Sequence, residues 1–265
     1  MFDYGKRTYI MGILNVTPDS FSDGGNFSNI DIAVNHAKEM IEQGADIIDL
    51  GGESTRPGHN YVDVEEEKRR IIPVIKKLKE EIKVPISVDT YKADVAEAAL
   101  ELGVEMINDV WGLRRDDNMA FVIAKHDAYV CIMHNQDGTD YDKDIIESIK
   151  EFLQESIDLG IKSGIKKEKI VLDPGIGFGK TFEQNIEVLR RLDEINDLGY
   201  PVLLGTSRKS VIGNVLNVEP KERVEGTIAT TVLGIRDGID IVRVHDVKEN
   251  IRAAKMADAI YRKQR

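Results

Sequence analysis

Short apolar runs alternate with longer amphipathic segments along the whole chain. The runs are rich in β-branched residues and apolar at successive positions, which is typical of parallel strands covered by helices. Nearly every run ends on a polar or glycine-rich signature. The predicted strands are residues 9–14, 46–50, 85–88, 105–107, 128–133, 169–172, 201–204 and 239–244.

The segments between these runs carry apolar positions at helical spacing. Strict alternation of strand and helix predicts an α/β fold with right-handed crossovers. Eight such units close naturally into a (β/α)8 TIM barrel, and an open doubly wound sheet is the alternative. No linker or abrupt change of composition divides the chain, so we predict a single domain over residues 1–265. The predicted helices are residues 32–43, 64–79, 93–102, 144–163, 183–198, 223–236 and 248–263, and glycine ends several of them, at Gly44, Gly103, Gly199 and Gly238.

Two connections are longer and richer in glycine than a plain link requires. They are residues 17–29, after the first strand, and residues 51–61, after the second. Long loops on the catalytic rim of a barrel commonly act as lids or binding loops, and a plain surface connection is the alternative. We therefore predict two long mobile loops beside the site.

Composition and charge narrow the range of partners. The chain has 265 residues, of which 42% are hydrophobic, and a formal net charge of −11, which argues against nucleic acid or an anionic membrane as a general partner. No apolar run is long enough to span a membrane, and the N-terminus lacks the pattern of a signal peptide. The single cysteine, Cys131, lies in an apolar run, which predicts a buried thiol and fits a reducing cytoplasm.

The last predicted strand carries two cationic candidates. Arg243 and His245 are two residues apart, so they project to the same face of the strand. Arginine offers a planar fork for phosphate oxygens, and the loops after the last two barrel strands are the habitual phosphate corner. We predict an anion site here. The alternative is that Arg243 pairs with a carboxylate of the barrel and His245 caps a neighbouring helix.

Polar residues end several other strands and should converge across the barrel mouth. Asp89, Asn108 and Asp173 offer mostly acceptors, which suits a flat heterocycle rich in hydrogen-bond donors, although Asp89 could instead be a helix N-cap. Lys209 lies in a hydroxyl-rich turn after the seventh strand, which suits an anion or a carbonyl group. Asn15 ends the first strand, where its carboxamide could share Mg²⁺ with waters and substrate phosphates.

The glycine-rich segment GIGFGKT, residues 175–181, resembles a phosphate-binding loop but does not match one. That motif needs four residues between its first glycine and Gly-Lys-Thr, whereas Gly175 and Gly179 enclose three. The histidines and the cysteine show no zinc-site spacing, and no Ser/His/Asp elbow is evident. The sequence therefore favours departure of a phosphate or diphosphate from a ring-shaped substrate over nucleotide-loop, zinc or serine chemistry.

Seven motifs follow one another over practically the whole chain. They are MGILNVTPDSFSDGG, GGESTRPG, SVDTYKADVAEAAL, INDVWG, LDPGIGFGKT, TSRKSVIG and RVHDV. Together they resemble the dihydropteroate synthases of folate biosynthesis, a family that sulfonamides target. This resemblance implies a cytoplasmic, homodimeric, magnesium-dependent transferase. It would condense 6-hydroxymethyl-7,8-dihydropterin diphosphate with 4-aminobenzoate to give 7,8-dihydropteroate and diphosphate.

The resemblance also implies roles for individual residues, with Asp89, Lys209, Arg243 and His245 as the catalytic group. We expect a dissociative substitution in which the diphosphate leaves first, so the protein mainly stabilises separating charge. The absence of an obvious general base is consistent with this expectation. The implied ligands are Asn15 for magnesium, Thr55, Arg243 and His245 for the diphosphate, Asp89, Asn108, Asp173 and Lys209 for the pterin, and Phe21, Asp23, Arg56, Pro57, Phe178 and Ser207 for the aminobenzoate.

One segment departs from the family pattern. After the fifth strand the chain reads MHNQDGTDYDKD, where the family more usually has Met-His-Met and then Gly-x-Pro, so the resemblance assigns no role to His134. Two other functions are weighed against the synthase. One is a methyltransferase that uses methyltetrahydrofolate, which would not require the Ser-Arg-Lys turn and the Arg-Val-His strand together with both long loops. The other is a non-catalytic pterin-binding protein. Five intact residues argue against it, namely Asn15, Phe21, Asp23, Lys209 and Arg243.

Overall fold

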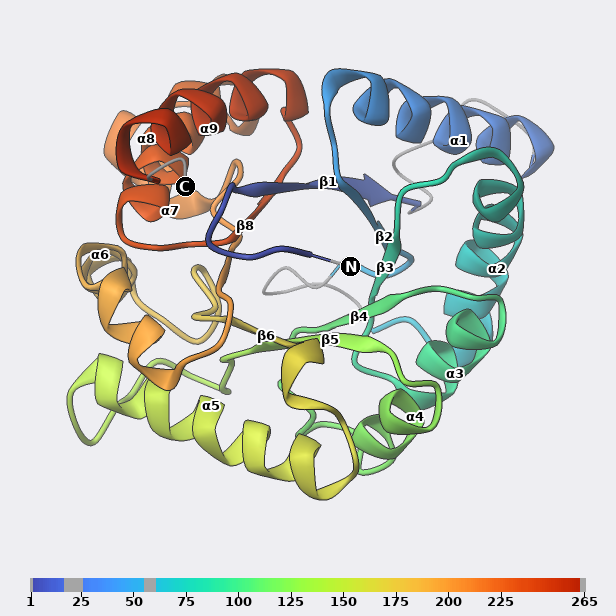
Figure 1. Ribbon diagram of the computed structural model, residues 1–265, viewed down its shortest axis with the longest axis horizontal. Helices are drawn as coiled ribbons and strands as arrows, with labels where there is room; N and C mark the ends of the chain where they lie inside the picture. The colour runs from blue at the N-terminus through green and yellow to red at the C-terminus, as the bar shows by residue number, and fades with distance from the viewer. Residues whose placement is uncertain (1, 17–25, 55–60, 263–265) are drawn as a thin grey trace.

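The computed structural model describes residues 2–16, 26–54 and 61–262. Within these ranges, eight parallel strands form one sheet that curls into a barrel, and helices surround it (Figure 1). No helix in the described ranges is long and apolar enough to cross a membrane. The strands are β1 (Tyr9–Asn15), β2 (Ile47–Gly51), β3 (Ile86–Asp89), β4 (Met106–Asp109), β5 (Tyr129–Met133), β6 (Ile170–Asp173), β7 (Leu203–Leu204) and β8 (Ile241–Val244).

The order of the strands closes the barrel. Neighbours run β6-β5-β4-β3-β2-β1-β8-β7, so that β1 pairs with both β2 and β8. Between β6 and β7, Leu172 forms a parallel bridge with Val202, and its N–H donates to the Pro201 carbonyl over 2.9 Å. The predicted (β/α)8 barrel is therefore confirmed, and the open doubly wound sheet is wrong.

The helices cover the outside of this barrel (Figure 1). They are α1 (Asn26–Gln43), α2 (Val64–Glu81), α3 (Ala93–Glu101), α4 (Met119–Lys125), α5 (Ile145–Lys162), η2 (Lys167–Lys169), α6 (Phe182–Arg190), η3 (Leu192–Leu198), α7 (Ser210–Leu216), η4 (Pro220–Glu222), α8 (Val224–Arg236) and α9 (Val247–Tyr261). The sequence pattern missed α4 and α7, because each has only seven residues, about two turns, and so carries little periodicity. The helix predicted over residues 183–198 is wrong as a single element, since α6 is followed by a separate 3₁₀ helix, η3.

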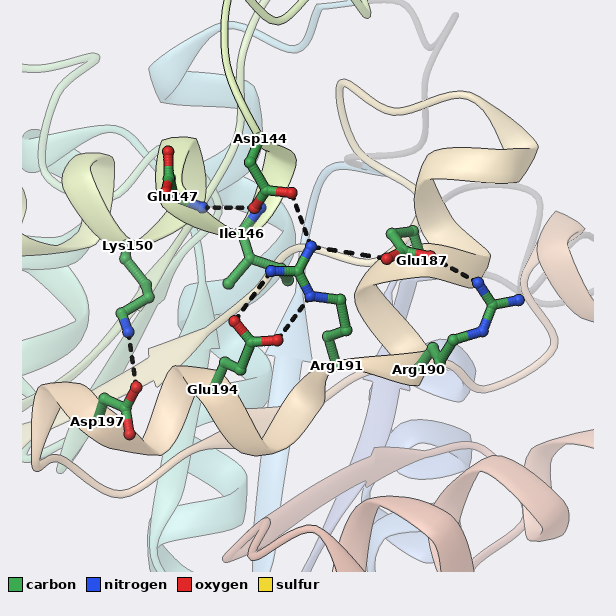
Figure 2. A network of polar contacts seen from close by, with 9 residues as sticks. All are labelled: Asp144, Ile146, Glu147, Lys150, Glu187, Arg190, Arg191, Glu194 and Asp197. Atoms are coloured by element: carbon green, nitrogen blue, oxygen red, sulfur yellow. Dashed lines mark hydrogen bonds and ion pairs between the residues drawn. The ribbon is translucent and has the colours of Figure 1, made fainter.

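The break between α6 and η3 falls at Arg191, whose backbone leaves the helical region at φ −121° and ψ 30°. Its guanidinium bonds Glu194 of η3 over 2.6 Å and Asp144 over 2.7 Å, and lies 3.6 Å from Glu187 of α6 (Figure 2). Asp144 is also the N-cap of α5, where it accepts the N–H of Ile146. One arginine thus ties three helices together, and these ion pairs favour the bend over a continuous helix.

The amino-terminal half of the barrel interior is apolar. Buried apolar side chains of the strands form an inner cluster there. Phe2 and Tyr4 of the N-terminal segment pack against this inner cluster, and Figure 1 shows the N-terminus inside the ring of strands. The ring of Phe2 meets Tyr9 edge-on, with ring centres 4.9 Å apart. Cys131 is fully buried here, as predicted. Polar chemistry is therefore left to the carboxyl ends of the strands. The buried residues of the inner cluster are Tyr9, Met11, Ile47, Met106, Cys131, Val171, Leu203 and Ile241.

Candidate active site

Strand register places the predicted acceptors at one level. Asn15 of β1 is aligned with Gly51 of β2, Gly51 with Asp89 of β3, and Asp89 with Asn108 of β4. Aligned residues on neighbouring parallel strands project to the same side of the sheet. The structure therefore brings these side chains together at the carboxyl end of the barrel. Asp89 is not a helix N-cap, since Lys92 occupies that position of α3.

Arg243 lies between two carboxylates. Its Nε donates to Oδ2 of Asp49 over 2.6 Å, and its Nη2 donates to Oδ2 of Asp89 over 2.7 Å. The Asn108 amide donates to the same Asp49 oxygen over 3.2 Å. The structure thus shows the pairing with barrel carboxylates that was the alternative for Arg243.

Asp49 is a site residue that the sequence analysis missed. It lies in the middle of the apolar run of β2 and does not end it, so the search for polar strand ends passed over it. Two signals in the sequence could have found it. Asp49 is the charged residue of that strand, and it lies two residues before Gly51, so the two residues face the same side of the sheet. It is fully buried, so its charge requires a partner, which Arg243 supplies.

Three acceptor oxygens at this centre are buried without a hydrogen-bond partner in the described ranges. They are the Oδ1 atoms of Asp49, Asp89 and Asn108. The pKa of Asp89 is raised to about 7, and burial is the largest cause. The Arg243 guanidinium opposes this rise, and the Asp49 carboxylate adds to it. Burial lowers the pKa of Arg243, but the two carboxylates more than offset this, so the guanidinium stays charged. One guanidinium is therefore shared by two carboxyl groups, and the centre has fewer hydrogen-bond donors than acceptors.

Asp173 and Lys209 form a second part of the rim. Both lie beside Gly205, since a Cβ added there would be 3.7 Å from Asp173 Oδ2 and 3.8 Å from Lys209 Nζ. Burial raises the pKa of Asp173, while the Lys209 ammonium lowers it. Lys209 also donates to the Ile176 carbonyl, and its Nζ lies 4.6 Å from the centre of the Phe178 ring. A cation, a carboxylate and an aromatic ring thus meet at one place.

His245 is held by Ser207. The Ser207 hydroxyl accepts the backbone N–H of His245 over 3.1 Å and lies 3.0 Å from its Nδ1. A hydroxyl that accepts one hydrogen can donate its own to Nδ1, which leaves the proton of a neutral ring on Nε2. Arg208 pairs with Asp246 over 3.0 Å, which leaves Lys209 as the cation that this turn directs toward Asp173.

Five predicted ligands lie outside the described residues. Phe21 and Asp23 belong to the first long loop, and Thr55, Arg56 and Pro57 belong to the second. The mobility predicted for the two loops stays a prediction. The predicted end of the first loop at residue 29 is wrong, since α1 begins at Asn26.

The barrel and its rim define a class, namely (β/α)8 barrels that gather buried carboxyl groups and cations at the carboxyl end of the sheet. The family model described as pterin binding enzyme matches residues 11–245. The chain is 59% identical to the dihydropteroate synthase of Clostridium beijerinckii, over 99% of this chain and 97% of that one. It is 53% identical to the Bacillus subtilis enzyme, over 98% and 91%. The chain belongs to the dihydropteroate synthases, transferases that join 6-hydroxymethyl-7,8-dihydropterin diphosphate to 4-aminobenzoate.

Solved structures agree with this assignment. Dihydropteroate synthase from Clostridium difficile, crystallised in the presence of pteroic acid, superposes with a TM-score of 0.98 at 78% identity, covering 99% of this chain and all of that one. The Xanthomonas albilineans enzyme with 4-aminobenzoic acid gives 0.92 at 42% identity, over 97% and 94%. Both are similar in fold over nearly their full length. These relatives support neither the methyltransferase nor the non-catalytic pterin-binding protein.

Proposed function

We propose that the buried acceptors in the carboxyl half of the barrel bind the pterin ring. The observation that carries this proposal is the group of three unpaired, buried Oδ1 atoms on Asp49, Asp89 and Asn108. An unpaired buried acceptor costs about 1–3 kcal/mol, so a ligand that supplies N–H donors recovers that free energy. The 2-amino-pyrimidine edge of a pterin is such a donor. Asp173 and Lys209 would hold its remaining polar edge.

Arg243 and His245 would bind the diphosphate, with Thr55. Arg243 is kept cationic by its two carboxylates and can attract the diphosphate oxygens. In the dissociative route, the C–O bond breaks and its electrons leave with the diphosphate. The methylene cation then forms a C–N bond with the arylamine, which loses a proton. Carboxylates beside the developing cation lower the free energy of that charge separation.

Mg²⁺ is expected at the end of β1. Asn15 is partly buried there, and its Oδ1 faces Gly51, where an added Cβ would lie 3.4 Å away. The described residues contain no cluster of three His, Cys, Asp or Glu side chains that could hold a metal alone. One carboxamide oxygen fits Mg²⁺ that keeps waters and shares phosphate oxygens. Bound there, the ion would offset charge on the leaving diphosphate.

The aminobenzoate would lie beside the Phe178 ring and the Lys209 ammonium. An aromatic face and a nearby cation suit an aromatic carboxylate. Ser207 faces His245 in the structure, so its contribution to this ligand would be indirect. The remaining contacts would come from Phe21, Asp23, Arg56 and Pro57.

The chain is proposed to work as a cytoplasmic homodimer. Helices α7, α8 and α9 lie together on one side of the barrel (Figure 1) and expose large apolar side chains. Among these, Val215 is 60% exposed and Met256 63%. Sedimentation tests this proposal: Met256→Glu should shift the protein toward monomer, and an unchanged dimer would exclude Met256 from the interface.

Diphosphate release is the direct test of the site. With the pterin diphosphate and Mg²⁺, release should be coupled to dihydropteroate formation when 4-aminobenzoate is added. Asp89→Asn, which keeps the shape but replaces one carboxyl oxygen with an NH2 group, should raise KM for the pterin diphosphate on the order of 10- to 100-fold. Asp94→Asn, exposed on α3, is the matched control and should leave KM unchanged. An unchanged KM in Asp89→Asn would sink the pterin assignment.

A further inference from the structure

Lys180 is a buried lysine that the proposed chemistry does not use. It is 9% exposed, and its Nζ donates to the carbonyls of Gly175 and Phe178, each over 3.0 Å. The third partner is Nδ1 of His134, 2.8 Å away. Burial, followed by the Lys180 charge, lowers the pKa of His134 to about 2, so this ring nitrogen is available as an acceptor at neutral pH. Burial lowers the pKa of Lys180 itself to about 7. In the protonated form, the three donors of its ammonium meet three neutral acceptors.

The glycines of the GIGFGKT segment explain why these acceptors lie so close together. Gly175 has φ 71°, and a Cβ there would lie 1.9 Å from the His134 carbonyl oxygen. Gly179 has φ 54°, and its Cβ would lie 2.8 Å from the Gln136 carbonyl oxygen. The turn between β6 and α6 therefore packs its backbone directly against the loop after β5. Tyr141 of that loop adds a hydrogen bond from its hydroxyl to the Gly179 carbonyl over 2.7 Å.

The same turn carries two groups of the reaction site. Its Ile176 carbonyl accepts a hydrogen bond from Lys209, and its Phe178 ring lies under the Lys209 ammonium. Lys180 binds the carbonyls on either side of Ile176, at Gly175 and Phe178. We infer that Lys180, oriented by His134, is a positioning residue. It fixes the position of the Phe178 ring, and this position determines the affinity for the arylamine substrate. This inference rests on the proposed contact between Phe178 and 4-aminobenzoate.

A double-mutant cycle tests the inference through KM for 4-aminobenzoate, measured at saturating pterin diphosphate. Lys180→Met keeps the length of the side chain and removes all three donors. It should raise this KM on the order of tenfold, with a smaller change in kcat, because a displaced aromatic contact weakens binding before it affects chemistry. In a Phe178→Leu background the same change should have little further effect, because the ring that Lys180 positions is gone. Lys125→Met, an exposed lysine on α4 bonded to Glu97, is the matched control.

The outcomes separate the inference from the function on which it rests. If Phe178→Leu alone leaves KM for 4-aminobenzoate unchanged, the proposed contact with the substrate fails. If Phe178→Leu raises KM but Lys180→Met does not, or the two effects multiply independently, the positioning role is overturned. Should Lys180→Met fail to fold, Tyr141→Phe replaces it, since it removes one hydrogen bond to the same turn. Tyr141→Phe should raise KM for 4-aminobenzoate about two- to fivefold, and this rise should vanish in the Phe178→Leu background. If Tyr141→Phe does not raise KM, the inference is overturned.

Discussion

The two ends of the barrel interior are built on the same strands but are stabilised in opposite ways. At the amino end, apolar side chains fill the interior and Phe2 packs over them. Two residues further along three strands, Ile47 gives way to Asp49, Met106 to Asn108 and Ile241 to Arg243. A step of two keeps the side chain on the same face, so the change of chemistry needs no change of backbone.

The amino end serves stability, whereas the carboxyl end also serves function. The amino-end cluster is stabilised by apolar burial, and the Tyr4 hydroxyl packed against it is buried without a partner among the described residues. The carboxyl end keeps three such acceptor oxygens, on Asp49, Asp89 and Asn108. Such acceptors cost stability in the free protein and gain a partner only when a ligand is bound. Substitutions at the amino end should therefore change stability alone, whereas substitutions at the carboxyl end should change catalysis as well.

The largest effect is expected for Arg243→Ala. Turnover should fall about 10²- to 10³-fold, since the cation that faces the leaving group is lost. The free energy of unfolding should also fall by about 3–5 kcal/mol, because Asp49 and Asp89 lose their shared partner. Steady-state kinetics and urea denaturation measure the two quantities. Arg7→Ala, which removes the bonds to Asp46 at the amino end, is the control and should leave turnover unchanged. Near-normal turnover in Arg243→Ala would remove Arg243 from the mechanism.

Ile47→Ala should lower stability and leave catalysis unchanged. The side chain is fully buried in the amino-end cluster, so its truncation should lower the free energy of unfolding by about 2–5 kcal/mol. KM and kcat, measured where the variant is still folded, should stay within about twofold. A clear rise in KM for the pterin diphosphate would show that the two ends are not independent.

The pH dependence of stability should reveal the crowded carboxylates. Burial raises the pKa of Asp89 from 3.8 to about 7, so between these values the folded protein holds a proton that the unfolded chain has released. This carboxyl therefore makes the free energy of unfolding fall as pH rises through that window. Asp89→Asn lacks the titration, and its stability relative to the parent should rise by more than about 1 kcal/mol from about pH 5 to 7.5. A difference that does not vary with pH would mean that Arg243 keeps Asp89 ionised throughout.

The smallest effect is expected outside the barrel. Arg191→Ala removes the bonds to Asp144 and Glu194 that tie η3 to α5. Exposed ion pairs contribute little, so the melting temperature should fall by no more than about 3 °C and kinetics should not change. A larger fall would show that the bend after α6 supports the whole barrel.

The strand ends of the site were predictable, and its interior was not. Asp89, Asn108 and Asp173 each close an apolar run, and parallel register then brings such residues to one edge. Asp49 was hidden because it interrupts a run without ending it. The bond between His134 and Lys180 joins two loops, and no spacing along the chain encodes such a contact. Among the helices, α4 and α7 were missed because they are short. The break at Arg191 was missed because no glycine or proline marks it in the sequence.

The pairing of β1 with β8 also has a consequence in time. Tyr9 is aligned with Ile241, so the first strand of the barrel cannot complete its pairing until the last strand has been synthesised. At synthesis rates of about 5–20 residues per second, that wait lasts tens of seconds, during which one edge of β1 has no partner strand. The nascent chain can form its local β-α units early, but the rim that carries Arg243 exists only after the ring closes.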